Sequence, residues 1–456
     1  MISLEQAIRW TGAAPRGALP PSFPSVSTDT RALGSGCLFV ALRGERFDGH
    51  RFAADAVKAG AGAVVAAADA ELAPDLPALV VPDTAEALRN LAAGWRAAVA
   101  PRVLGVTGSA GKTTTKELCA HLLGALGPVA RTLGNFNNSI GLPLSILAMP
   151  EDSRFGVFEA GTNHPGEIAP LAALMRPDAA VLVNVGPVHL GNFGGSERAI
   201  ANEKADLLRA VPSDGFCVLD ASGAHFRFLR DQCRAPVATV SPDPSVAADF
   251  RVIASDVTTG AFRLRDSEDG SERDLRAPRP GAHQILDALL AVAAARRFGV
   301  SWDDISARLG SAPNARMRWE RVERDGAAWI NDAYNANPLS MRRALETFAS
   351  TPPPARGGRR IAVLGDMGEL GEDDEERLHR EVGRAAATSG LDALVCVGPR
   401  AEWIAAGAGD SGMARADIVR VSDAAAAREA LADLVRPGDL VLLKASRSMA
   451  LERVLE

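Results

Sequence analysis

Lysine is scarce in this chain. Only five of the 50 basic residues are lysine, namely Lys58, Lys112, Lys116, Lys204 and Lys444. Arginine is therefore the default cation of the protein. Because the two side chains are not interchangeable, a lysine kept against this background is a candidate for a role that arginine cannot fill.

Cysteine is also sparse and dispersed. The five cysteines stand at positions 37, 119, 217, 233 and 396, and no Cys-x-x-Cys pair occurs. This spacing excludes a disulfide framework and a typical zinc site. We therefore expect reduced thiols in a cytoplasmic protein.

Long apolar runs and excess positive charge are missing as well. No stretch approaches the roughly 18–20 apolar residues that a membrane-spanning helix needs. The segment Met1–Gln6 lacks the basic and apolar regions of a signal peptide. The formal net charge is −6 and the isoelectric point is about 5.8, which excludes the basic footprint of a nucleic-acid-binding protein. We expect neither a membrane span nor a nucleic-acid partner.

The length and the strand–helix pattern indicate several α/β domains. A chain of 456 residues suggests two to four domains at roughly 100–200 residues each. Short apolar strands, predicted at 103–107, 156–160, 180–185 and 216–220, alternate with helices from residue 83 onward. This alternation restarts near residue 314, with strands predicted at 327–330, 360–365, 393–397, 418–421 and 440–443. We predict three domains, at 1–82, 83–313 and 314–456, with parallel sheets covered by helices on both faces. A polar stretch at 245–280 predicts an antiparallel excursion with a hairpin turn at 266–271.

The strongest motif is a glycine-rich turn between the predicted strand 103–107 and a helix that begins near Lys112. Its residues are Gly108, Ser109, Ala110, Gly111, Lys112, Thr113 and Thr114. Backbone N–H groups of such a turn bind phosphates, assisted by the helix N-terminus. Lys112 would reach the outer phosphates and Thr113 would offer its hydroxyl to Mg²⁺. The motif is the shorter Gly-x-x-Gly-Lys-Thr, since Val106 stands where the general pattern has its first glycine.

Three further residues are candidates for metal and intermediate chemistry. Glu159 ends the predicted strand 156–160, where α/β sheets bind ligands, and its hard oxygens suit Mg²⁺. His189 follows the predicted strand 180–185. Lys204 lies in a predicted helix downstream of His189. A surface glutamate, a structural histidine and a solvated lysine are the alternatives for these three positions.

Taken in order, these pieces resemble the Mur ligase family. The resemblance rests on the phosphate loop, the glutamate after the second strand, the Asn-Val-x-x-x-His loop at 184–189 and the lysine fifteen residues later. It extends over essentially the whole length through the runs 27–31, 47–52, 363–370 and 444–449. The run 330–341 is similar to the branch of the family that adds D-alanyl-D-alanine, and the Asp-Asn-Pro-Arg motif of the diaminopimelate-adding branch is absent.

The resemblance implies a fold and a reaction. The fold would comprise an N-terminal nucleotide-sugar domain, a central phosphate-loop ATPase domain with a parallel sheet, and a Rossmann-like C-terminal domain. The reaction would be ATP-dependent ligation of D-alanyl-D-alanine to a UDP-N-acetylmuramoyl-tripeptide through an acyl phosphate. We expect a monomer that uses ATP and binds Mg²⁺ at two sites. Whether the third acceptor residue is diaminopimelate or lysine stays open.

The resemblance also implies roles for individual residues. Lys112, Glu159, His189, Lys204 and Asp332 would serve catalysis, and Lys204 would be carbamylated and join Thr113, Glu159 and His189 around the metal ions. Besides the phosphate loop, ATP would contact His283, Arg316, Tyr334 and Asn335. The substrates would contact Thr28, Asp29, Arg31, Asp48, Asn137, Asn138 and Asn337. Tyr334 is the only tyrosine in the chain, which makes it a further candidate for a specific role.

Two departures from the family pattern leave details open. Ala445 stands where the family usually carries glycine. The helix beside the adenine usually reads His-Asn-x-x-Asn, whereas this chain has Gln284 and Asp287 after His283. The base contacts are therefore unassigned.

Two other functional classes remain to be distinguished. A related ligase for folate polyglutamate or cyanophycin would share the central motifs, but folate ligases lack a Ser-Thr-Asp-Thr-Arg domain such as that at 27–31. A regulatory NTPase would use nucleotide binding only to switch a partner, and no switch sequence is recognisable. Dependence of phosphate release on both a carboxylate and an amine would separate these classes.

Overall fold

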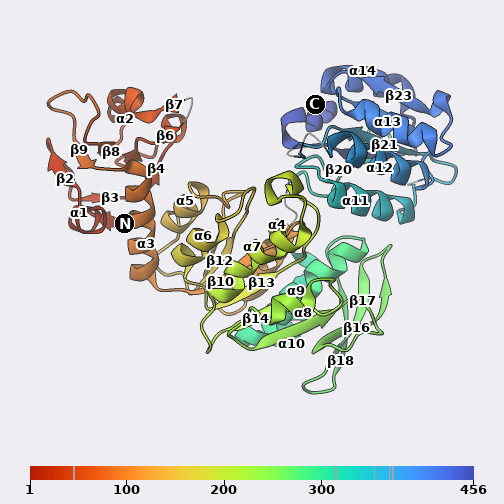
Figure 1. The fold of residues 1–456 in the computed structure, drawn as a ribbon, viewed down its shortest axis with the longest axis horizontal. Helices are drawn as coiled ribbons and strands as arrows, with labels where there is room; N and C mark the ends of the chain where they lie inside the picture. The colour runs from red at the N-terminus through yellow and green to blue at the C-terminus, as the bar shows by residue number, and fades with distance from the viewer. Residues whose placement is uncertain (45–46, 314–315, 354, 369, 372–373) are drawn as a thin grey trace.

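The structure is a computed structural model that describes residues 1–456 apart from 45–46, 314–315, 354, 369 and 372–373. Three α/β bodies follow one another along the chain and lie side by side, with the first at the left and the last at the upper right of Figure 1. The predicted α/β class with parallel sheets is confirmed. The domain boundary predicted at 313–314 and the run 363–370 each include a residue outside the described ranges, Asn314 and Glu369.

The N-terminal body contains a five-stranded sheet whose first strand in the order is antiparallel and whose others are parallel. Its central strand is an uninterrupted buried run of alanine and valine, as expected of a strand covered on both faces. In sheet order the strands are β2 (Ala14–Arg16), β9 (Ala78–Val81), β8 (Ala63–Ala67), β5 (Leu38–Val40) and β4 (Val26–Ser27). The helices of this body are α1 (Leu4–Thr11) and α2 (Ala53–Lys58), and two short ladders pair β1 (Ile2–Ser3) with β3 (Ser22–Phe23) and β6 (Arg43–Gly44) with β7 (Phe47–Asp48). Helix α3 (Thr84–Val99) follows, and it contacts α1 as well as helices of the central body.

The central body contains a nine-stranded sheet that is parallel at one end and antiparallel at the other. In sheet order its strands are β11 (Val129–Arg131), β12 (Phe155–Glu159), β10 (Arg102–Thr107), β13 (Ala179–Leu182), β14 (Phe216–Asp220), β15 (Val237–Ser241), β16 (Phe250–Asp256), β17 (Ala261–Asp266) and β18 (Glu272–Arg276). Its helices are α4 (Lys112–Leu123), α5 (Gly141–Leu147), α6 (Ile168–Met175), α7 (Glu197–Arg209), α8 (Phe226–Arg230), α9 (Ala282–Phe298) and α10 (Trp302–Arg308). The buried helix α9 packs against α4, which carries the phosphate loop on its N-terminus.

The C-terminal body contains a six-stranded sheet in which only the edge strand β19 is antiparallel. In sheet order the strands are β19 (Glu320–Arg324), β20 (Ala327–Asn331), β24 (Leu440–Lys444), β21 (Arg360–Gly365), β22 (Ala393–Val397) and β23 (Ile418–Val421). The helices are α11 (Pro338–Ser350), α12 (Glu375–Ala387), α13 (Ala401–Asp410) and α14 (Ala424–Leu434). Helix α11 faces the central body in Figure 1.

The sequence located most strands to within one residue, and it also located the hairpin. Strand β14 and strands β21, β22 and β23 coincide with the predicted ranges, and β17 and β18 form the predicted antiparallel hairpin. One predicted strand, 180–185, is wrong at its end because β13 stops at Leu182. The next residues leave the sheet, and Asn184 exchanges hydrogen bonds with Ala110 of the phosphate loop instead.

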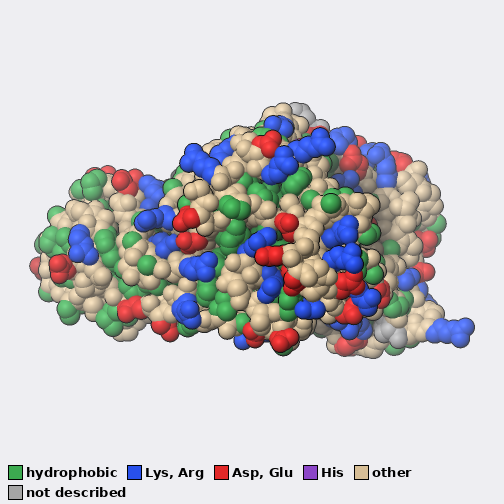
Figure 2. Space-filling view, turned by 90° about the horizontal axis from the view of Figure 1, so that it is seen from below, with side chains coloured by type: hydrophobic (Ala, Val, Ile, Leu, Met, Phe, Trp, Pro, Cys, Tyr) green, Lys and Arg blue, Asp and Glu red, His purple; other side chains and the backbone are tan. Residues whose placement is uncertain are grey.

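The surface carries charges of both signs. On the face in Figure 2, arginine and lysine side chains are interspersed with aspartate and glutamate. None of the helices in the described ranges is long and apolar enough to cross a membrane. All five cysteines are free thiols, as the sequence predicted.

Candidate active site

A cavity of about 480 Å³ lies between the central and C-terminal bodies. The structure brings most of the predicted site residues to its wall. From the central body these are Ser109, Ala110, Gly111, Lys112, Thr113, Thr114, Asn137, Asn138, Glu159, His189 and His283. From the C-terminal body they are Asp332, Tyr334, Asn335 and Asn337.

The phosphate loop is held by contacts with the segment after β13. The hydroxyl of Ser109 donates to the Gly186 carbonyl at 3.0 Å, and the N–H of Ala110 donates to Asn184 Oδ1 at 3.0 Å. Lys112 Nζ donates to the carbonyl of Gly108 at 2.9 Å, so the ammonium lies across the loop. Helix α4 begins at Lys112 and directs its N-terminal N–H groups toward the loop, which is the arrangement that binds phosphate.

Gly111 is required by both its conformation and its surroundings. Its φ is 82°, and a Cβ placed there would lie 2.5 Å from Asp287 Oδ1. The Asp287 carboxyl is therefore packed directly against the phosphate loop. It is almost fully buried, and neither of its oxygens has a hydrogen-bond partner among the described residues. Burial raises the pKa of Asp287 to about 7, although the positive charge of Arg343 favours its charged form.

Glu159 is buried at the end of β12 and is held from several sides. Its Oε2 accepts from Thr113 Oγ1 at 2.9 Å and its Oε1 accepts from Asn137 Nδ2 at 2.7 Å. Its backbone N–H donates to Thr132 Oγ1 at 2.8 Å. The carboxylate and the Thr113 hydroxyl thus face the same point beside the phosphate loop. Oxygen donors of this kind are the ligands that Mg²⁺ prefers.

His189 and Lys204 lie next to the phosphate loop and are electrostatically linked to Lys112. Burial, assisted by the charges of Lys112 and Lys204, lowers the pKa of His189 to about 4, so the ring is neutral near pH 7. Lys204 is 2% exposed on α7 and does not line the cavity. Burial and Lys112 lower the pKa of Lys204 to about 7, against the opposing charge of Glu203. Glu203 itself accepts hydrogen bonds from the N–H groups of Gly166 and Ile168 at the start of α6.

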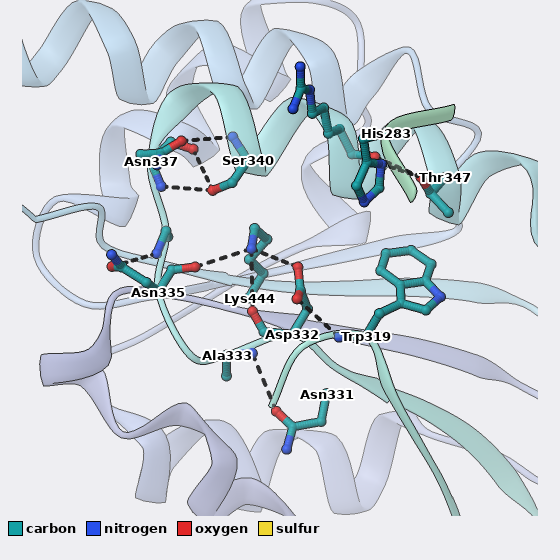
Figure 3. Close-up of polar contacts among 12 residues, drawn as sticks. His283, Trp319, Asn331, Asp332, Ala333, Asn335, Asn337, Ser340, Thr347 and Lys444 are labelled. Atoms are coloured by element: carbon teal, nitrogen blue, oxygen red, sulfur yellow. Dashed lines mark hydrogen bonds and ion pairs between the residues drawn. The ribbon is translucent and has the colours of Figure 1, made fainter. Parts of the chain in front are cut away.

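The C-terminal side of the cavity is organised by a buried ion pair (Figure 3). Lys444 Nζ lies 2.7 Å from Asp332 Oδ2 and donates to the carbonyl of Asn335 at 3.1 Å. Asn337 caps α11, since its Oδ1 accepts from the Ser340 N–H at 2.8 Å while Ser340 Oγ accepts from the Asn337 N–H. Asp332 and Asn335 are thereby held in one orientation at the entrance to the C-terminal body.

The residues predicted to contact ATP outside the phosphate loop lie in different surroundings, and not all of them reach the cavity. His283 lies at the start of α9 beside Thr347 of α11, and burial lowers its pKa to about 4. The guanidinium of Arg318 lies 4.2 Å from the centroid of the Tyr334 ring. Arg316 is exposed and is not among the residues that line the cavity.

The residues predicted to hold the uridine nucleotide lie at one edge of the N-terminal sheet. Asp29 follows β4 and accepts hydrogen bonds from the Arg31 side chain, at 2.9 Å from Nε and at 2.7 Å from Nη2. Asp48 pairs with His50, whose Nε2 accepts from the N–H of Ala67 at the end of β8. Because β4 and β8 belong to a parallel set, their carboxyl ends meet at the same edge. Thr28 lies beside Asp29, and these residues do not line the central cavity.

Close approaches join the central and C-terminal bodies around the cavity. A Cβ at Gly186 would lie 2.8 Å from Leu339 Cδ2, and a Cβ at Gly191 would lie 2.9 Å from the Cα of Gly371. A Cβ at Gly281 would meet Thr347 Oγ1 at 2.6 Å. The small residues therefore let the two walls of the cavity meet.

Some residues that line the cavity were not among the site residues predicted from the sequence. Arg318, Arg343, Asp287 and Lys444 all line the cavity. Lysine scarcity could have singled out Lys444, and the unusual aspartate could have singled out Asp287. Arginines are too common in this chain for Arg318 or Arg343 to stand out.

Models of three Mur ligase regions match consecutive parts of the chain. The "Mur ligase family, catalytic domain" matches residues 23–96, the "Mur ligase middle domain" matches 106–295, and the "Mur ligase, glutamate ligase domain" matches 317–447. A protein of Bacillus subtilis (strain 168) named UDP-N-acetylmuramoyl-tripeptide--D-alanyl-D-alanine ligase is 35% identical over 449 residues, which cover 94% of this chain and 92% of that one.

The chain belongs to the Mur ligase family. Solved Mur ligase structures agree over the whole fold. MurF from Acinetobacter baumannii superimposes with a TM-score of 0.88 at 29% identity, covering 100% of this chain and 98% of that one. MurF from Thermotoga maritima, solved in complex with ADP, has a TM-score of 0.79 at 29% identity and covers 94% of this chain and 96% of that one.

The structure accommodates one departure of this Mur ligase from the family pattern. Ala445 is fully buried, and a Cβ at Gly365 would lie only 2.7 Å from the Cβ of Ala445. The methyl group at 445 therefore fits because position 365 is glycine. The other departure, at Gln284 and Asp287, brings a carboxyl against the phosphate loop.

Proposed function

We propose that this Mur ligase joins D-alanyl-D-alanine to a UDP-N-acetylmuramoyl-tripeptide with ATP, forming the pentapeptide precursor of peptidoglycan. One observation carries the proposal. The phosphate loop with its Thr113–Glu159 pair faces the Asp332–Lys444 pair of another body across a single cavity. Relatives that bear this enzyme name match almost the full chain. ATP and a nucleotide-linked acceptor suit a cytoplasmic enzyme, and we expect it to act as a monomer.

The reaction would proceed in two balanced steps. The terminal carboxylate of the tripeptide attacks the γ-phosphorus of ATP, which forms an acyl phosphate and releases ADP. The amine of D-alanyl-D-alanine then attacks the acyl carbon, the amide bond forms, and inorganic phosphate leaves while the amine loses a proton. Lys112 and the N–H groups at the start of α4 stabilise charge on the phosphates. Closure of the two bodies would exclude water from the reactive acyl phosphate.

The donor set beside the phosphate loop fits Mg²⁺. A hydroxyl and a carboxylate oxygen lie 2.9 Å apart there, on Thr113 and Glu159. The described residues contain no cluster of three or more His, Cys, Asp or Glu that could enclose an ion, which agrees with a cation that keeps waters and binds substrate phosphates. When bound, Mg²⁺ neutralises charge on the phosphate oxygens.

A second ion would be held near His189 and a carbamylated Lys204. A carbamate forms only on a neutral amine, and burial makes that form accessible by lowering the pKa of Lys204. The carbamate would supply oxygen ligands on a long arm, which arginine cannot provide. The neutral ring of His189 would have a nitrogen lone pair to offer.

We also propose that the segments 1–82, 83–313 and 314–456 divide the substrates among them. Arg31 tests this division because its side chain is 88% exposed at the edge of the N-terminal sheet. Arg31→Ala should raise the KM for the nucleotide tripeptide about ten-fold, the size of one lost charge-assisted hydrogen bond, and leave the KM for ATP unchanged. The exposed Arg89 of α3 offers a matched control. Equal rises in both KM values would refute separate binding sites.

The buried Asp287 should make stability depend on pH. Its pKa rises from 3.8 to about 7 on folding because burial disfavours the charge, so the folded protein loses stability as pH rises from about 4 to 7. The surrounding charges on Arg343, Arg279 and Arg318 reduce this penalty without abolishing it. Asp287→Asn should therefore raise Tm by several degrees at pH 8.5 and by clearly less at pH 5. Thermal unfolding at both pH values measures this, and an equal change at both would contradict it.

Phosphate release with defined substrates tests the proposed reaction. Release should require the nucleotide tripeptide, and amide product should appear only with D-alanyl-D-alanine. Acceptors with diaminopimelate and with lysine at the third position should be compared in parallel. Product from glutamate and a folate, or ATP hydrolysis that needs neither substrate, would instead support the two alternative classes.

A further inference from the structure

Lys116 is a fully buried lysine outside the groups assigned to the reaction. It lies on α4, one turn after Lys112, and its side chain is 0% exposed. Its Nζ donates to the carbonyls of Thr132 at 2.8 Å and Gly134 at 3.4 Å, and it lies 2.9 Å from Glu117 Oε1. Burying an ammonium is costly unless it is paired and hydrogen-bonded. The three contacts meet that requirement and use the three donors of a lysine.

The two carbonyls belong to a segment that holds Glu159. Residues 132–138 follow β11 and cross the edge of the sheet beside β12. The Thr132 hydroxyl accepts from the Glu159 N–H, and the Asn137 amide donates to the Glu159 carboxylate. The carbonyl of Asn137 also accepts from the N–H of Gly161 at 2.9 Å. Glu159 is thus fixed by both ends of the segment that Lys116 anchors.

Apolar packing contributes little to holding this segment. Leu133 is 49% exposed and Phe136 is 44% exposed, so its two large apolar side chains face outward. Its other anchors are polar as well. The Leu133 N–H donates to Ser145 Oγ at 3.2 Å, and Asn138 Oδ1 accepts from the N–H groups of Ile140 and Gly141 at the start of α5. Removing one buried ionic anchor should therefore displace the segment without unfolding the core around it.

We infer that Lys116 is a positioning residue that orients Glu159 and Asn137 through the segment 132–138 and so sets the affinity for the Mg²⁺-bound nucleotide. Lys116 is not among the residues that line the cavity, and its Nζ instead contacts the carbonyl of Thr132 in this segment. The inference rests on the proposed function only in taking Glu159 as a Mg²⁺ ligand. An outer partner of a metal ligand typically changes metal affinity by about 10–100-fold.

Calorimetric titration with ADP, with and without Mg²⁺, tests the inference without relying on turnover. Lys116→Met keeps the length of the side chain and removes its charge. We expect it to lose about ten-fold or more in ADP affinity with Mg²⁺ present and less than about two-fold with chelator. Lys58→Met is the matched control, since Lys58 is 80% exposed on α2, and it should bind as the unaltered protein does. An unchanged Mg²⁺ dependence in Lys116→Met, or equal losses with and without Mg²⁺, would overturn the inference.

A double-mutant cycle with Asn137→Ala separates positioning from general weakening. If Lys116 acts through the segment, the second substitution should add little to the first, because contacting groups of one network are not additive. Full additivity would overturn the inference. Should Lys116→Met fail to fold, Thr132→Val removes the hydroxyl that accepts from Glu159 and must show the same Mg²⁺-selective loss. Failure of the proposed function would appear separately, as absence of amide product from the unaltered enzyme.

Discussion

Lys112→Ala should lower turnover by at least about 10³-fold while leaving the fold intact. The ammonium lies across the phosphate loop, 2.9 Å from the Gly108 carbonyl, where it can follow the charge that develops on the transferred phosphoryl group. Removing one preorganised charge of this kind costs about 10²–10³ in rate, and more in phosphoryl transfer, where positioning and charge carry the reaction. The measurement is steady-state phosphate release with all three substrates.

The folding control for Lys112→Ala is a thermal melt, because the side chain is only partly buried. Its Tm should stay within a few degrees of the unaltered protein. Lys58→Ala, which removes an exposed lysine, should retain full turnover. Near-native turnover of Lys112→Ala would remove the phosphate-loop assignment, whatever the family resemblance.

Lys204→Ala should lose most activity and recover part of it when formate or acetate is added. The side chain is almost fully buried near His189 and Lys112, so its truncation leaves a cavity close to the positive charge of Lys112. A small carboxylate can enter that cavity and replace the anion of the carbamate near the second metal ion. Activity should rise with the concentration of the acid and saturate.

Lys204→Arg is the discriminating companion variant. A guanidinium stays positive at every relevant pH and fills the space, so this variant should be inactive and should not respond to formate. A solvated lysine on a helix face, the alternative raised by the sequence, predicts normal activity for both variants. Full activity of Lys204→Arg, or a bare amine at 204 in an active nucleotide complex, would end the carbamate proposal without affecting the ligase assignment.

Local structure that depends on residues close together in the sequence could be predicted. The strand at 103–107, the turn at Gly108–Gly111 and the helix from Lys112 are specified by neighbours in the chain, because apolar runs form strands and glycines permit the turn. The same holds for the hairpin at 266–271. In contrast, the end of β13 depends on Asn184 bonding to Ala110, 74 residues away, and local pattern carries no record of that contact.

The sequence alone therefore established the fold class, the phosphate loop and the family, since each depends on local propensity or on short motifs in a fixed order along the chain. Tertiary packing decided which side chains meet. Asp332 and Lys444 are 112 residues apart, yet they pair because β20 and β24 are neighbours in one sheet. Likewise, Lys116 reaches the segment that holds Glu159, and Asp287 comes against Gly111, only because α4 lies between β11 and α9. Burial raises the pKa of Asp287 and lowers the pKa values of His189 and Lys204, and burial is a property of the folded arrangement.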